Sequence, residues 1–165
     1  MAIDFLKRCV LFLSLCLAQA LVFNRIQLFN CAMPLLYTYF VLTFRRGYPR
    51  WSSLLWSFAL GLVVDMCSNT PGVATSSLTF LAFLQPYVLE LFVPREAEEN
   101  MCASVADMGW GKFFAYSAVM LSVYCLVFFT IEAFNFFNWQ HWLACVWGSM
   151  LLTLILVMTM ESVRK

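Results

Sequence analysis

The sequence predicts an all-α, polytopic membrane protein: a six-helix transmembrane bundle that forms a single integral membrane domain over residues 1–165. Composition is the first observation behind this prediction, because 63% of the residues are hydrophobic and only 12% are charged. A soluble domain usually carries about 25% charged residues. The second observation is the spacing of lysine and arginine, which are absent from long apolar stretches.

The basic residues sort to one side when these stretches are threaded across a bilayer. One side then carries Lys7, Arg8, Arg45, Arg46, Arg50, Arg95, Lys112, Arg164 and Lys165, and the other carries only Arg25. Such a bias places the basic side in the cytoplasm. We therefore expect a multi-pass cell-membrane protein with cytoplasmic N- and C-termini.

Six stretches are long and apolar enough to cross a bilayer, which takes about 20 residues. They are residues 5–23, 26–44, 51–67, 71–93, 113–131 and 142–160. Pro34 predicts an irregularity in the second stretch, and Pro86 predicts a bend in the fourth. Thr70 followed by Pro71 is typical of an N-cap and the first position of a helix.

The first stretch also fits a second interpretation. Basic residues precede it and Ala18-Gln19-Ala20 lies near its end, a pattern that is shared with cleavable signal peptides. Cleavage would leave the remaining topology unchanged. We expect the first helix to be retained.

The longest segment between stretches, residues 94–112, is predicted to be cytoplasmic and amphipathic. Ala97, Met101, Val105 and Met108 recur at helical spacing and form one apolar stripe. The stripe packs against the protein's own bundle or the membrane surface, or it docks a cytoplasmic partner. The acidic residues on the opposite face slightly favour a protein contact over a contact with anionic lipid.

Asp65 is the most informative side chain. It lies fourteen residues after Trp51, or about 21 Å along a helix, which places it inside the hydrocarbon region. A carboxylate there must be paired, hydrogen-bonded or protonated. It accepts hydrogen bonds from the turn at residues 68–72, contacts a partner helix, or serves as a proton or ion site.

Small residues share the helix face of Asp65. Ser53, Ser57 and Gly61 precede it at intervals of four residues, and the start of the following stretch is also rich in alanine, serine and threonine. Small residues allow helices to approach closely in a membrane. The third and fourth stretches are therefore predicted to form a tight hairpin.

The sequence predicts no catalytic, metal-binding or cofactor-binding site. Its single histidine, His141, has no ligand-type neighbours, and no nucleophile–base pair or phosphate-binding glycine loop occurs. No extended basic patch suggests nucleic-acid binding. These observations argue against an enzyme.

The segment from Gly61 through Asp65 to Thr70-Pro71-Gly72 resembles the signature of the rod shape-determining protein MreD family. Leu-Leu-Tyr-Thr-Tyr-Phe at residues 35–40 and Phe-Val-Pro-Arg-Glu at residues 92–96 are also similar to this family. The resemblance implies a non-enzymatic scaffold of the bacterial elongation machinery, which builds the lateral peptidoglycan wall. MreC is the implied direct partner, and MreB, RodA and the transpeptidase of RodA belong to the same complex.

The resemblance also assigns expectations to particular residues. The hairpin residues Ser57, Gly61, Asp65, Thr70, Pro71 and Gly72 become structural or partner-contacting candidates. The family fold is similar to that of the substrate-binding subunits of energy-coupling-factor transporters. A vitamin-binding transporter subunit is therefore the alternative function, although the outer loops look too short to cover a ligand.

The charge pattern makes a direct prediction about topology. Reporter fusions within residues 45–50 should report a cytoplasmic location, because this loop carries three arginines. Fusions near residue 70 serve as the opposite-side control. An external location for residues 45–50 would refute the predicted topology.

Overall fold

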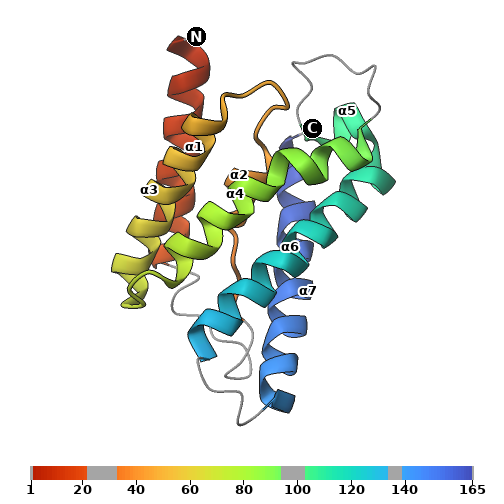
Figure 1. Ribbon diagram of the computed structural model, residues 1–165. Coiled ribbons are helices and arrows are strands. Elements are labelled where there is room, and N and C mark those ends of the chain that lie inside the picture. Colours follow the sequence, from red (N-terminus) through yellow and green to blue (C-terminus); the bar gives the residue numbers. More distant parts are fainter. Residues whose placement is uncertain (1, 22–32, 94–102, 134–138, 165) are drawn as a thin grey trace.

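The computed structural model describes residues 2–21, 33–93, 103–133 and 139–164, and these parts are helical without a strand. Their helices are α1 (Ala2–Leu21), α2 (Thr38–Leu42), α3 (Arg50–Ser68), α4 (Val73–Phe92), α5 (Val105–Met108), α6 (Trp110–Ala133) and α7 (Trp139–Arg164). The start of α1 and the end of α7 lie at the same end of the molecule (Figure 1).

Three of the described helices are long and apolar enough to cross a membrane. They are α3, α6 and the part of α7 from Trp139 to Val163. The protein is therefore an all-helical membrane protein. Helices α1 and α4 are also 20 residues long, but the six-span arrangement as a whole stays a prediction.

The second predicted stretch, residues 26–44, is interrupted more strongly than the local irregularity that Pro34 predicts. In its described part, residues 33–35 are not helical and α2 contains only five residues. Pro34 explains the break, because proline lacks a backbone N–H and disfavours helical geometry in the preceding residue. The segment is nevertheless deeply buried, with Leu35 and Tyr37 at 2% and 1% exposure.

Hydroxyl groups of α7 provide hydrogen-bond partners for this non-helical backbone. Ser149 Oγ accepts from the N–H of Met33 at 3.0 Å, and Thr153 Oγ1 accepts from the N–H of Leu35 at 3.1 Å. Thr153 Oγ1 also donates to the carbonyl oxygen of Ser149 at 2.6 Å. Irregular backbone that is buried in the protein requires such internal partners.

Two buried glutamines bond carbonyl groups of the same segment. Gln19 of α1 donates from Nε2 to the carbonyl oxygen of Pro34 at 3.1 Å. Gln85 of α4 donates from Nε2 to the carbonyl oxygen of Phe44 at 3.3 Å. Helices α1, α4 and α7 therefore hold residues 33–44 in the interior through side-chain hydrogen bonds.

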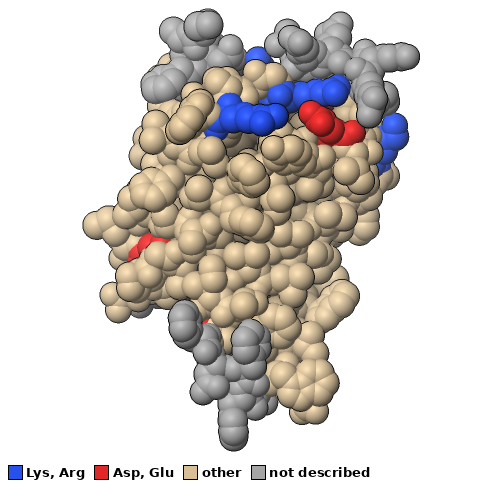
Figure 2. Space-filling model, viewed as in Figure 1, with Lys and Arg blue, Asp and Glu red and all other residues tan. Residues whose placement is uncertain are grey.

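The described basic side chains gather near one end of the molecule (Figure 2). The guanidinium group of Arg8 lies 4.0 Å from the ring centroid of Tyr48, which brings α1 beside the loop before α3. Arg50 lies 5.5 Å from the ring centroid of Tyr87, near the end of α4. Arg25 lies outside the described residues.

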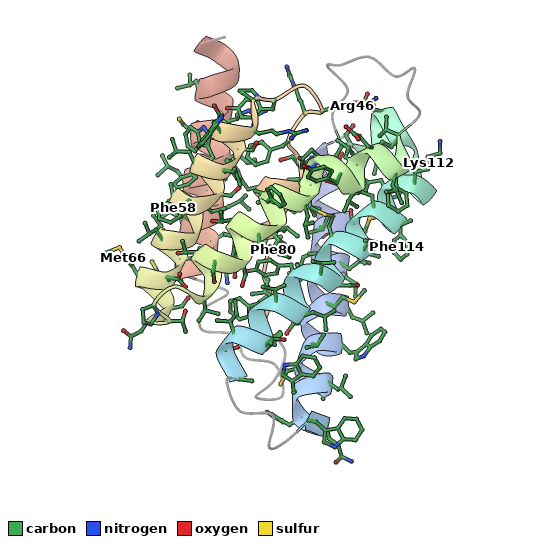
Figure 3. The ribbon with its side chains drawn as sticks, in the orientation of Figure 1. Arg46, Phe58, Met66, Phe80, Lys112 and Phe114 are labelled. Atoms are coloured by element: carbon green, nitrogen blue, oxygen red, sulfur yellow. The ribbon has the colours of Figure 1, made fainter. Side chains whose placement is uncertain are left out.

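An apolar stripe runs along the outward face of α3. Its members are large hydrophobic residues at helical spacing that are 42–87% exposed: Trp51, Leu55, Phe58, Leu62 and Met66. Phe58 and Met66 point away from the bundle (Figure 3). A contiguous exposed stripe of this kind is suited to lipid.

Replacement of both Ser149 and Thr153 by alanine should destabilise the protein. Each substitution leaves a buried N–H without its acceptor, at a cost of about 1–3 kcal/mol. The measurement is unfolding in dodecyl sulfate, followed by circular dichroism. Thr159→Ala is the matched control, because this threonine of α7 is exposed and its hydroxyl donates only within its own helix. Equal stability of the double variant and the control would contradict the role of the two hydroxyls.

Candidate functional site

Helices α3 and α4 form a tight hairpin, as the small residues predict. The buried face of α3 consists of Ser53, Ser57, Leu60, Gly61, Val64 and Asp65. A Cβ atom on Gly61 would lie 2.4 Å from Thr75 Cα and 3.1 Å from the carbonyl oxygen of Ala74. The backbone of α4 therefore occupies the space that a side chain at residue 61 would need.

Asp65 lies at the closed end of this hairpin and is only 5% exposed. Its carboxylate accepts from the backbone N–H groups of Gly72, Ala74 and Thr75 at 2.9–3.1 Å. The hydroxyl of Thr75 also donates to it at 2.6 Å, and that of Thr70 donates at 3.2 Å. The side chain therefore caps the N-terminus of α4, where N–H groups lack helical acceptors and favour a negative charge.

The connecting turn has the backbone geometry that this cap requires. Asn69 ends α3 in the left-handed conformation, with φ 56° and ψ 34°. Gly72 has φ 89° and ψ −9°, and the N–H of Val73 donates to the carbonyl oxygen of Thr70 at 3.4 Å. This is a type II turn with Pro71 and Gly72 in its central positions.

The turn corrects the expected start of the fourth helix. Gly72, rather than Thr70, is the N-cap, and Val73 rather than Pro71 is the first helical residue. Gly72 has no side chain that could cap the helix, and Asp65 of the preceding helix supplies the capping oxygens instead.

The structure brings most of the predicted hairpin residues together. Gly61, Asp65, Thr70 and Gly72 share the contacts at the closed end. The hydrogen bonds expected between Asp65 and the turn are present, and they extend into the first turn of α4. Ser57 lies two helical turns away, where its buried hydroxyl has no hydrogen-bond partner within the described structure.

A second buried carboxylate, Glu161 of α7, was not among the predicted residues. It is 4% exposed and accepts from the hydroxyl of Tyr39 at 2.5 Å and from the N–H of Val105 at 3.2 Å. It therefore binds the start of the short helix α5 to α2 and α7. In the sequence, Glu161 lies close to Arg164 and Lys165, a pattern that suggests an exposed tail. The only sequence signal for a buried carboxylate is its position directly after a long apolar stretch.

The described part of the predicted amphipathic segment packs against the bundle. Val105 and Met108 are 6% and 9% exposed and belong to the hydrophobic core. This corrects their assignment as docking candidates, because the core already covers them. Ala97 and Met101, the other residues of the stripe, lie outside the described residues.

A small cavity adjoins the closed end of the hairpin. Its volume is about 190 Å³, and its polar lining includes Gln19, Ser68, Thr70 and Glu132. Tyr37 also lines the cavity, and its hydroxyl group lies 2.6 Å from that of Tyr124. A small polar ligand in this cavity would lie beside the hairpin residues Ser68 and Thr70.

Comparisons with protein-family models, with curated proteins and with solved structures found no match.

Replacement of Gly61 by alanine should destabilise the hairpin. The new methyl group would collide with the backbone of Thr75, which cannot move without the helix, and overpacking costs about 1–3 kcal/mol. Gly111→Ala is the matched control, because a Cβ on this glycine of α6 meets nothing within 4 Å. Thermal unfolding in detergent should separate the two variants. An unchanged midpoint for Gly61→Ala would show that the close approach is not required.

Proposed function

We propose that this chain is an MreD-like, non-enzymatic scaffold of the bacterial elongation complex that binds MreC in the cell membrane. The single observation that carries the proposal is that residues of the MreD-like motif lie together in the structure. Gly61, Asp65, Thr70 and Gly72 all take part in one buried hairpin end. The residues that resemble the family signature therefore all help to close the α3–α4 hairpin in this chain.

The hydrogen bonding of Asp65 favours a scaffold over a proton or ion site. Both carboxylate oxygens accept hydrogen bonds, from three backbone N–H groups and two hydroxyls. Movement of a proton to this group would disturb the start of α4. A fixed carboxylate instead gives the hairpin a rigid end.

The hairpin end offers a surface for a membrane-embedded partner. Met66 is 80% exposed beside Asp65, and Pro71 and Gly72 are also exposed. We propose that MreC packs here, at the end away from the basic residues. MreB, RodA and its transpeptidase then join through the same complex, and the termini of this chain are cytoplasmic.

The cavity beside the hairpin is the observation that favours the alternative function, a vitamin-binding transporter subunit. Its volume of about 190 Å³ is below the range of about 300–1,000 Å³ that is usual for ligand sites. A larger cavity of about 310 Å³ lies at the basic end, which is predicted to be cytoplasmic, whereas such a subunit needs a pocket that opens outward. The scaffold is therefore the better supported proposal. Saturable binding of a vitamin to the purified protein would favour the transporter subunit instead.

The variant Asp65→Ala should lower the yield of folded protein and the amount of MreC that co-purifies with it. Loss of the carboxylate leaves several buried N–H groups at the start of α4 without an acceptor, at a cost of about 3 kcal/mol or more. The measurement is co-purification with the co-expressed MreC, in mild detergent and in lipid nanodiscs.

Two further variants separate folding from partner binding. Met66→Ala should reduce MreC recovery at an unchanged yield, because its side chain is exposed. Thr159→Ala, at an exposed position of α7, should leave both quantities unchanged. Failure of the wild-type protein to retain MreC in both environments would refute the proposed function.

A further inference from the structure

A second, larger cavity lies at the opposite end of the α3–α4 hairpin. The two helices meet at the Asp65 turn and diverge toward the end that carries the basic residues (Figure 1). The loop before α3 borders the opening between them, and the cavity has a volume of about 310 Å³. It is independent of the MreC surface proposed above.

Three arginines and one glutamate line this cavity. Arg45 and Arg46 come from the loop, Arg50 from the first residue of α3, and Glu90 from the end of α4. These side chains leave a net formal charge of +2. Guanidinium groups are planar donors that match the geometry of phosphate oxygens. The lining is thus suited to an anion with several acceptor oxygens.

Aromatic side chains lie around the same cavity and place it at the edge of the membrane. Trp51, Phe83 and Tyr87 all belong to its lining and are 87%, 53% and 46% exposed. Exposed tryptophan and tyrosine are typical of the membrane–water boundary. The ring of Tyr87 also lies beneath the guanidinium group of Arg50. This arginine is therefore held beside an aromatic residue of the kind found at the membrane–water boundary.

Apolar surface continues from the cavity toward the closed end of the hairpin. Phe58 of α3 and Phe80 of α4 are 47% and 44% exposed and lie below the basic end (Figure 3). The phosphate group of an amphiphilic ligand would therefore lie at the arginines, and its hydrocarbon chains would lie along the apolar surface. A free phosphate ion would contact only the arginines.

We propose that the cavity lined by Arg45, Arg46 and Arg50 binds the phosphate of an anionic phospholipid, whose acyl chains lie along the exposed apolar faces of α3 and α4. Its volume is at the lower end of the range for ligand sites, which suits a headgroup rather than a whole lipid. Basic pockets between membrane helices bind lipid headgroups in this manner.

The test measures lipid retention by the full-length protein. Protein purified from equimolar phosphatidylglycerol and phosphatidylcholine is analysed by native mass spectrometry. Wild-type protein should retain phosphatidylglycerol preferentially. The double variant Arg46→Gln/Arg50→Gln should weaken this preference about 25-fold, since each basic residue contributes about fivefold. Lys112→Gln, a basic residue at the same end but outside the cavity lining, should retain the wild-type preference.

Glu90→Gln keeps the proposal testable if the double variant does not fold. Removal of this exposed carboxylate from the cavity should increase retention of phosphatidylglycerol, because a negative charge beside the phosphate is lost. An unchanged or lower retention would overturn the proposal, as would an unchanged preference in a folded Arg46→Gln/Arg50→Gln variant. Displacement of the lipid by inorganic phosphate at millimolar concentration would also overturn it, by identifying a soluble anion as the ligand.

Discussion

This structure depends on one constraint: buried backbone N–H groups that have no partner within a helix must find a hydrogen-bond acceptor elsewhere. The chain is largely apolar, so water cannot satisfy such groups within its interior. Asp65 accepts from N–H groups at the start of α4, and Glu161 accepts from the first N–H of α5. Ser149 and Thr153 do the same for the non-helical segment before α2. These four polar side chains therefore determine where a neighbouring segment can begin or bend.

The two ends of the α3–α4 hairpin differ in both packing and chemistry. At the Asp65 end, the backbones approach so closely that only glycine fits at residue 61. At the other end, the helices separate around a basic cavity with aromatic side chains. One rigid hairpin can thus serve two different contacts. Our proposals assign a protein partner to the closed end and a phospholipid to the open end.

Much of the hairpin could be predicted from the sequence, because its signals are local. The interval from Gly61 to Asp65 and the Pro71-Gly72 turn identify a close approach and a buried acid within a dozen residues. The break at Pro34 was expected only as an irregularity. The N–H groups of Met33 and Leu35 bond hydroxyls of α7 that lie 116 and 118 residues later in the chain. No spacing rule in the sequence identifies which face of α7 would meet them. Glu161 and the burial of Val105 depend on the same long-range packing.

The hydrogen bonds between residues 33–35 and α7 also impose an order on biogenesis. The ribosome adds roughly 5–20 residues each second, so Met33 and Leu35 are synthesised several seconds before Ser149 and Thr153. During this interval, their N–H groups lack the acceptors that they have in the folded protein. The interior of the protein can therefore close only after α7 has been synthesised.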